Sequence, residues 1–386
     1  MLIERQLYKK IKPFLASKET IVITGMRRVG KTTLLKYIFE QVKSENKLMI
    51  DLENPLNRKI FEETDYERIK TSLEGLGLDF KKRVHLFLDE IQFSPNIPSA
   101  VKYLLDHYKV KFFLTGSASF YLKNLFSESL VGRKFLFELY PFNFQEFLAL
   151  RENNLVIPKK ITQFLWQKFS SFYEEYLEFG GFPEVILKIS KQEKIKSLQE
   201  VFSSYFQVEV KQLGDFKKDE KIRDMLLLLA ERVGSKLDVQ KLSQELGLAR
   251  ETVHQYLAFL EGTYFMHTIK PFSQSRDIEI RKTPKIYLCD CGLANQIAKL
   301  NRGSLFEQAV FQGLKPKGEI NYYQRKSGAE VDFILNKKLA FEVKITPQQS
   351  DWNGLARVCH DISVKDYRLI SLNYSQLKKV IYGFEV

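Results

Sequence analysis

The sequence predicts an α/β protein: a parallel sheet at the N-terminal end, a helical middle region and a second α/β domain at the C-terminal end. Four short, nearly continuous apolar runs alternate with helical stretches between residues 20 and 139, as in strands buried on both faces of a parallel sheet. Residues 151–234 have a helical, Lys/Glu-rich pattern, and short apolar runs return after residue 284. These three segments, each with its own pattern of apolar and charged residues, define the fold class.

Length and charge add two expectations. A chain of 386 residues predicts about two to three domains. The changes in residue pattern along the chain suggest the parts 1–150, 151–235, 236–283 and 284–386. Lys and Arg exceed Asp and Glu by 13, which favours an anionic partner, either a nucleotide or a nucleic acid. Three cysteines suit a reduced compartment, and no apolar run reaches the length of a membrane span. We therefore expect a cytoplasmic protein without membrane contact.

The first region carries a phosphate-binding pattern between an expected strand, 21–24, and an expected helix, 32–43. Residues 25–32 read Gly-Met-Arg-Arg-Val-Gly-Lys-Thr and fit G-x-x-x-x-G-K-[ST]. Gly25 and Gly30 let the backbone wrap a phosphate, Lys31 would reach the β- and γ-phosphates, and Thr32 would hold Mg²⁺. The expected ATP-binding residues are Gly25, Arg28, Gly30, Lys31, Thr32 and Thr33. The alternative is a glycine-rich turn with an incidental Lys-Thr pair.

Two carboxylates end the apolar run 84–88. Asp89 would support Mg²⁺, and Glu90 would polarise the attacking water as a general base. The run 111–115 leads into Thr115 and Ser117, either of which could lie beside Asp89 and sense the γ-phosphate, or simply cap the next helix. The alternative for Asp89 and Glu90 is a pair of solvated acids at a strand end.

Arg133 follows an expected helix, 120–130. An arginine near the γ-phosphate, either in cis or from a neighbouring subunit of a homo-oligomer, would stabilise transition-state charge. A surface arginine is the alternative.

The middle of the chain has a helix-turn-helix pattern: a helix over 237–246, a turn at Gly247, a second helix over 249–260 and a hairpin-like segment over 264–280. This arrangement resembles a winged helix-turn-helix. If it reads DNA, the contacts on the second helix would be Arg250, His254 and Gln255. The basic residues of the wing region are Lys270, Arg276, Arg281 and Lys282. Glu251 and Glu261 would repel phosphates, so a packing or partner-docking role stays open.

A second set of charged residues lies on two expected strands, 331–335 and 341–345. Alternation puts Glu342 and Lys344 on one face, and Asp332 can point the same way. The pattern resembles the PD-(D/E)xK core of restriction-endonuclease-like domains, with Val331 in place of the proline. That resemblance implies Mg²⁺ held by Asp332 and Glu342, assistance by Lys344, and a further acid, Glu307, on the helix 305–314. Ion pairs at polar strand edges, or a degenerate domain that grips DNA, are the alternatives.

Several motifs occur together in a specific order: 25–32, 88–92, 115–119, 132–133 and 140–142, followed by 179–184, 287–293 and 323–333. In this order they resemble the AAA-family ATPases of bacteria and archaea that carry a C-terminal domain of unknown function, over nearly the whole chain. The resemblance implies ATP binding and hydrolysis. We expect an Mg²⁺-dependent ATPase that drives a DNA-directed C-terminal module, with a nuclease as one form of it. The alternative is a nucleotide-gated switch or scaffold whose nuclease-like domain is inactive.

Overall fold

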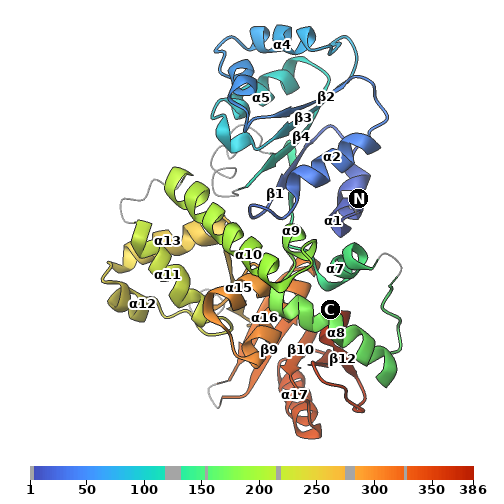
Figure 1. The fold of residues 1–386 in the computed structure, drawn as a ribbon, viewed down its shortest axis with the longest axis vertical. Coiled ribbons are helices and arrows are strands. Elements are labelled where there is room, and N and C mark those ends of the chain that lie inside the picture. The colour runs from blue at the N-terminus through green and yellow to red at the C-terminus, as the bar shows by residue number, and fades with distance from the viewer. Residues whose placement is uncertain (1–3, 118–131, 153–154, 214–218, 274–282, 326–327) are drawn as a thin grey trace. The chain divides into compact units, whose positions relative to one another are not determined.

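The structure, a computed structural model, describes residues 4–117, 132–152, 155–213, 219–273, 283–325 and 328–386 (Figure 1). It divides into two compact units, one of residues 1–140 with 262–264 and one of residues 141–261 with 265–386. The fold class expected from the sequence is confirmed: a parallel sheet, helices in the middle and a separate C-terminal α/β sheet. The finer division into four parts stays a prediction.

The first unit contains a five-stranded sheet in the order β2-β3-β4-β1-β5, and all neighbouring strands are parallel. Its strands are β1 (Thr20–Thr24), β2 (Lys47–Asp51), β3 (Val84–Asp89), β4 (Val110–Gly116) and β5 (Lys134–Glu138). The helices are α1 (Gln6–Ile11), α2 (Lys31–Gln41), α3 (Pro55–Arg58), α4 (Tyr66–Gly75) and α5 (Ile97–His107). Four strands were expected; β5 is additional.

Side chains on alternate faces of this sheet meet different helices. Leu86 and Phe112 pack in a core with Ile69 of α4 and Val101 of α5. On the other face, Phe87 stacks on Phe113 with ring centroids 4.3 Å apart and meets Phe39 of α2 at 5.1 Å. Because successive residues of a strand point to opposite faces, strands covered on both sides must be apolar throughout. The carboxyl ends of these strands form the edge that carries the candidate nucleotide site.

The second unit contains a seven-stranded sheet in the order β12-β11-β10-β9-β8-β6-β7. Its strands are β6 (Met266–Pro271), β7 (Lys285–Leu288), β8 (Ile320–Gln324), β9 (Glu330–Leu335), β10 (Leu339–Lys344), β11 (Asp366–Ser371) and β12 (Val380–Tyr382). β6 pairs antiparallel with β7 and parallel with β8. β6, which lies in the expected hairpin 264–280, is thus part of the large sheet, and its antiparallel partner β7 lies beyond that segment. Arg276, Arg281 and Lys282 lie outside the described residues, whereas Lys270 is on β6 and exposed.

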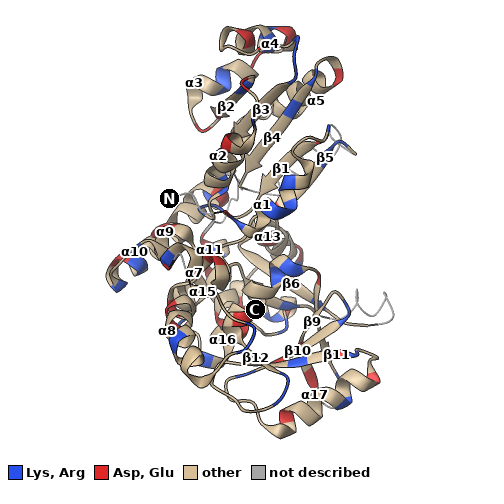
Figure 2. Cartoon of the chain, turned by 90° about the vertical axis from the view of Figure 1, so that its right-hand side faces the viewer, with Lys and Arg blue, Asp and Glu red and all other residues tan. Residues whose placement is uncertain are grey.

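Helices make up most of the rest of the second unit. They are α7 (Phe144–Arg151), α8 (Gln163–Phe179), α9 (Pro183–Ile186), α10 (Lys191–Tyr205), α11 (Asp219–Glu231), α12 (Val239–Leu246), α13 (Arg250–Gly262), α15 (Cys291–Ala298), α16 (Arg302–Leu314) and α17 (Gln349–Asp361). Figure 2 shows basic and acidic residues interspersed on outer helices such as α8 and α17. No helix in the described part of the chain is both long enough and apolar enough to span a membrane.

Two of the motifs behind the family resemblance meet at one buried carboxylate, Asp290. Its Oδ1 accepts the N–H of Leu293 at 2.9 Å and caps α15, while its Oδ2 accepts the N–H of Gly181 at 2.7 Å and an Nε2–H of Gln312 at 2.9 Å. A Cβ atom on Gly180, whose φ is +75°, would lie 1.9 Å from Oδ1 of Asp290. The glycine turn after α8 is therefore required for close packing against the start of α15.

Candidate functional site

The phosphate-binding pattern forms a loop between β1 and α2. Three of its residues have left-handed backbone conformations, with φ of +151° at Gly25, +67° at Arg28 and +95° at Gly30. A Cβ atom on Gly25 would lie 2.1 Å from the carbonyl oxygen of Leu139, so a larger residue does not fit there. The loop backbone turns sharply into the N-terminus of α2, where N–H groups have no partner within the helix and favour an anion.

Lys31, the first residue of α2, is only 4% exposed. Its ammonium donates hydrogen bonds to the carbonyl oxygens of Gly25 and Met26, both at 3.1 Å. Arg5, in the N-terminal segment, also contacts this loop. Its guanidinium donates to the carbonyl oxygen of Val29 in the loop at 2.9 Å and to that of Tyr140 at 2.7 Å. No motif in the sequence indicates Arg5. The buried ammonium thus lies inside the loop.

Asp89 lies at the carboxyl end of β3 and is 2% exposed. It accepts a hydrogen bond from the hydroxyl of Thr115 on β4, and the side chain of Thr32 on α2 also hydrogen-bonds to it. Burial raises the pKa of the Asp89 carboxyl, and the two hydroxyl groups and the charge of Lys31 oppose that shift. The structure therefore brings Lys31, Thr32, Asp89 and Thr115 together, whereas Thr33 is exposed on α2.

Glu90 is joined to β4 through Gln92. The Nε2 group of Gln92 donates to Oε2 of Glu90 and, at 3.0 Å, to Oγ of Ser117, whose own N–H donates back to Oε1 of Gln92 at 3.3 Å. The backbone N–H of Glu90 donates to the hydroxyl of Thr115 at 3.2 Å. With φ of +53°, Glu90 is in a left-handed conformation that costs a non-glycine residue about 1 kcal/mol or more. Gln92 lies two residues after Glu90, but no pattern rule indicates this contact.

Arg133 lies apart from the other predicted residues of the nucleotide site. It directly precedes β5, whose first residue, Lys134, is paired with Thr20 at the start of β1. The phosphate loop follows the other end of β1, about 16 Å away for a strand of this length. Arg133 forms an ion pair with Asp106 instead. The residue therefore lies at the amino edge of the sheet, away from the phosphate loop of its own chain, and its role near a γ-phosphate stays a prediction.

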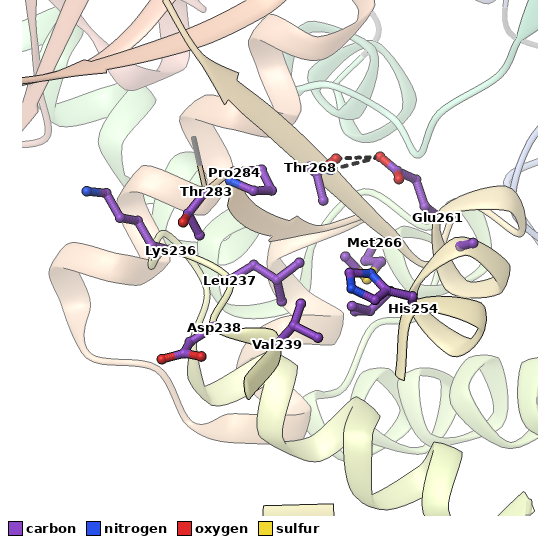
Figure 3. A pocket seen from close by; sticks show the side chains of 12 residues that line it. Lys236, Leu237, Asp238, Val239, His254, Glu261, Met266, Thr268, Thr283 and Pro284 are labelled. Atoms are coloured by element: carbon purple, nitrogen blue, oxygen red, sulfur yellow. Dashed lines mark hydrogen bonds between the residues drawn. The ribbon is translucent and has the colours of Figure 1, made fainter. Parts of the chain in front are cut away.

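The three candidate DNA contacts all lie on α13 and are exposed. His254 lines a cavity of about 790 Å³ between α13, the start of α12, β6 and the two residues before β7, where its ring lies beside Met266 (Figure 3). Glu261 lines the same cavity and accepts hydrogen bonds from the hydroxyl of Thr268 at 2.7 Å and its N–H at 3.2 Å. The structure thus directs His254 toward β6, and brings neither Arg250 nor Gln255 into that cavity.

The second set of predicted residues comes together on β9 and β10. Phe333 pairs with Phe341 in an antiparallel register, which sets Asp332 opposite Glu342. Oδ2 of Asp332 accepts the N–H of Val343 at 2.8 Å, and the ammonium of Lys344 donates to Oε1 of Glu342 at 2.7 Å. Oε2 of Glu342 is buried without a hydrogen-bond partner.

Glu307 of α16 joins this cluster. Burial and the nearby charge of Asp332 raise the pKa of Glu307 to about 7 and that of Glu342 to about 8. The hydroxyl of Tyr287 donates to Glu307 at 2.6 Å, and the ammonium of Lys285 lies 3.6 Å from it. Lys285, which also forms an ion pair with Glu330, and Tyr287 lie on β7 and are not indicated by the motif.

The metal-binding capacity of these carboxylates is restricted. Within the described ranges, no group of three or more His, Cys, Asp or Glu side chains is arranged so as to hold a metal ion. A cation bound at β9 and β10 would therefore rest on at most two protein carboxylates, with water and a phosphate oxygen as the remaining ligands.

Three family models match different parts of the chain. Residues 17–148 match the AAA domain, residues 170–304 match a domain of unknown function (DUF8612), and residues 302–381 match a second one (DUF4143). The N-terminal part of the chain is therefore an AAA-type domain, and the families of the C-terminal part carry no assigned activity.

Similar proteins span most of the chain. An uncharacterized protein of Methanocaldococcus jannaschii is 27% identical over 383 residues, covering 94% of this chain and 83% of that protein. One of Haemophilus influenzae is 25% identical, covering 86% and 84%. Among solved structures, AMPPCP-bound DnaA from Aquifex aeolicus is 17% identical with a TM-score of 0.30, covering 68% of this chain and 89% of DnaA. PCH-2 of C. elegans is 16% identical with a TM-score of 0.29, covering 50% and 56%.

Proposed function

We propose that the N-terminal domain binds ATP with Mg²⁺ and hydrolyses it. The observation that carries this proposal is the convergence of Lys31, Thr32 and Asp89 at the carboxyl edge of the sheet, with Glu90 one residue further. The loop N–H groups and the N-terminus of α2 would bind the phosphates, and Lys31 would exchange its two carbonyl partners for phosphate oxygens.

The residues present fit a magnesium ion. The hydroxyl of Thr32 and the carboxylate of Asp89 are hard oxygen donors, and Mg²⁺ in nucleotide sites commonly uses only one or two protein groups beside phosphates and water. When bound, the ion neutralises phosphate charge. Glu90 would accept a proton from the attacking water, with its carboxylate oriented by Gln92. Through Gln92, Ser117 is linked to Glu90 and could report the state of the γ-phosphate.

Replacing Glu90 with glutamine tests the general-base role. Glu90→Gln keeps the shape of the side chain but removes its basicity, so ATP turnover should fall about 10²- to 10³-fold. Nucleotide affinity should stay within a few-fold, because Lys31, Thr32 and Asp89 are unchanged. Phosphate release at saturating ATP and binding of a fluorescent ATP analogue measure the two quantities. Glu45→Gln, at an exposed position of the same unit, is the matched control. Undiminished turnover in Glu90→Gln would contradict the assignment.

We further infer that the C-terminal unit acts on nucleic acid as a metal-dependent nuclease, coupled to the ATPase. The convergence of Glu307, Asp332, Glu342 and Lys344 supports this second function. Asp332 and Glu342 would hold the metal ion, which lowers the pKa of bound water and neutralises phosphate charge. Lys344 would lie next to the scissile phosphate. Arg250 and Gln255 on α13 are candidate DNA contacts, and Arg133 would serve the site of another copy in a homo-oligomer.

The competing function is a nucleotide-gated switch or scaffold in which these carboxylates are structural. The ion pairs of Lys285 with Glu307 and Glu330 are the observation that favours it. Asp332→Asn distinguishes the two: a nuclease should lose EDTA-sensitive cleavage at least about 100-fold while ATP turnover is unchanged. Cleavage is assayed on single-stranded, duplex and branched DNA with Mg²⁺ or Mn²⁺, with thermal unfolding as a check on folding. If the wild-type protein cleaves none of these substrates, the switch is favoured.

A further inference from the structure

The edge of the second sheet carries a small basic cavity that no motif predicts. It has a volume of about 330 Å³ and is lined by residues of β11, β12 and the adjoining turns: Lys365, Asp366, Tyr367, Arg368, Lys379 and Ile381. Three of these six side chains are cations and one is an acid. Lys365, Arg368 and Lys379 are exposed, and none of the three forms an ion pair with another described residue. The cavity therefore holds a local excess of positive charge.

Aromatic rings, rather than a carboxylate, hold one of these cations. The ammonium of Lys379 lies 5.3 Å from the ring centroid of Trp352 on α17 and 5.6 Å from that of Tyr367. The two rings are 4.9 Å apart. Lys379 also has a left-handed backbone, with φ of +61°. A cation over aromatic faces is ordered without being neutralised, so it keeps its charge for an anionic ligand.

The cavity adjoins the strand that carries Glu342 and Lys344. β11 runs parallel to β10, with Ala340 paired to Tyr367 and Glu342 paired to Leu369. Tyr367 is therefore two positions, about 7 Å, before the partner of Glu342 and points to the same face of the sheet, whereas Arg368, paired with Phe341, points to the other face at the sheet edge. Lys365 is four positions, about 13 Å, before the partner of Glu342, so a polyanion that follows β11 would reach both sites.

We propose that this cavity binds the phosphodiester backbone of a nucleic-acid strand and supplies much of the DNA affinity of the second unit. Arg and Lys side chains recognise phosphate oxygens, Arg through paired N–H donors and Lys as a point charge. A cavity at the lower end of the usual range for ligand sites has room for a phosphate and its sugar rather than a large ligand. The choice of nucleic acid over an acidic protein rests on the proposed function of the neighbouring carboxylate–lysine cluster.

Charge reversal tests the proposal on the full chain. The triple variant Lys365→Glu, Arg368→Glu, Lys379→Glu is compared with Lys159→Glu, Lys168→Glu, Lys196→Glu, which makes the same charge change at exposed positions elsewhere in the second unit. Binding of a fluorescein-labelled single strand and the matching duplex is followed by anisotropy in EDTA, which prevents cleavage, at several salt concentrations. The cavity variant should lose at least about tenfold in affinity near 0.1 M salt, and its salt slope should shrink by about 2 to 3. The control variant should keep most of the wild-type DNA affinity and most of the salt slope.

Equal losses in the two triple variants would overturn the proposal, because net charge alone would then explain DNA binding. So would wild-type protein that binds no DNA, or that prefers a labelled polyglutamate. Asp332→Asn separates this inference from the proposed nuclease, since it should abolish cleavage and leave DNA affinity unchanged. If DNA binding depends on the cavity but the protein cleaves no DNA, only the proposed nuclease activity is refuted. If the cavity variant still binds and cleaves DNA as the wild type does, only the proposed binding role of the cavity is refuted.

Discussion

The Lys31→Ala variant is expected to bind ATP at least about 100-fold more weakly than the wild type and to show no turnover above background. Hydrogen bonds to charged groups contribute about 1.5 to 3 kcal/mol each, and the Lys31 ammonium can make two of them, to the β- and γ-phosphates. The ammonium is buried, at 4% exposure, and two hydrogen bonds hold it inside the loop, where the phosphates would bind. Phosphate release and nucleotide binding measure the loss.

Lys36→Ala is the matched control, because Lys36 lies on the same helix, five residues later, and is exposed. It should bind and hydrolyse ATP as the wild type does. If Lys31→Ala retains more than about a tenth of wild-type turnover, with both variants folded, the loop does not bind the phosphates and the ATP assignment is refuted.

The Asp290→Ala variant is expected to lower the free energy of unfolding of the second unit by about 3 to 5 kcal/mol. Asp290 is fully buried and accepts hydrogen bonds from two backbone N–H groups and from Gln312. Each donor left buried without a partner costs about 1 to 3 kcal/mol, and the space of the lost carboxylate adds to this. Denaturant titration followed by far-UV circular dichroism measures the change.

Asp224→Ala, at an exposed position of α11, should change the free energy of unfolding by less than about 0.5 kcal/mol. Asp290→Asn should be intermediate, because its NH₂ group would face donors at one of the two acceptor positions. A change below about 1 kcal/mol in Asp290→Ala would mean that the glycine turn and α15 are held together by other contacts.

The sequence predicts the first sheet well where strands are buried on both faces and poorly at its edge. β3 and β4 are nearly continuous apolar runs, interrupted by His85 and Lys111, because both faces of the sheet are covered by helices. β5 is missed because it pairs only with β1, and its residues are half-buried or exposed, with Leu136 at 40% exposure. An edge strand needs no continuous apolar run, so the local pattern alone does not identify it.

The sequence likewise predicts the positions of some candidate site residues and not of others. Lys31, Thr32, Asp89 and Thr115 meet as expected, because the carboxyl ends of parallel strands share one edge of the sheet. Arg133 does not meet these residues. Its position in the sequence relative to Asp89 does not indicate at which end of β5 it lies.

Contacts between distant parts of the chain are harder to predict. Arg5 reaches Val29, and Lys285 reaches Glu307, through the tertiary fold, and no short pattern encodes either contact. Glu330 could have been found, because it is two residues before Asp332 and alternation places both on one face of β9.

The most direct measurement is isothermal titration calorimetry of the purified full-length chain with ATP and Mg²⁺. The loop between Gly25 and Thr32, with its left-handed turns and buried ammonium, predicts a saturable heat signal with one site per chain. That signal should vanish in Lys31→Ala and persist in Lys36→Ala. A folded wild-type protein that releases or absorbs no heat with ATP or GTP in the presence of Mg²⁺ would contradict the account.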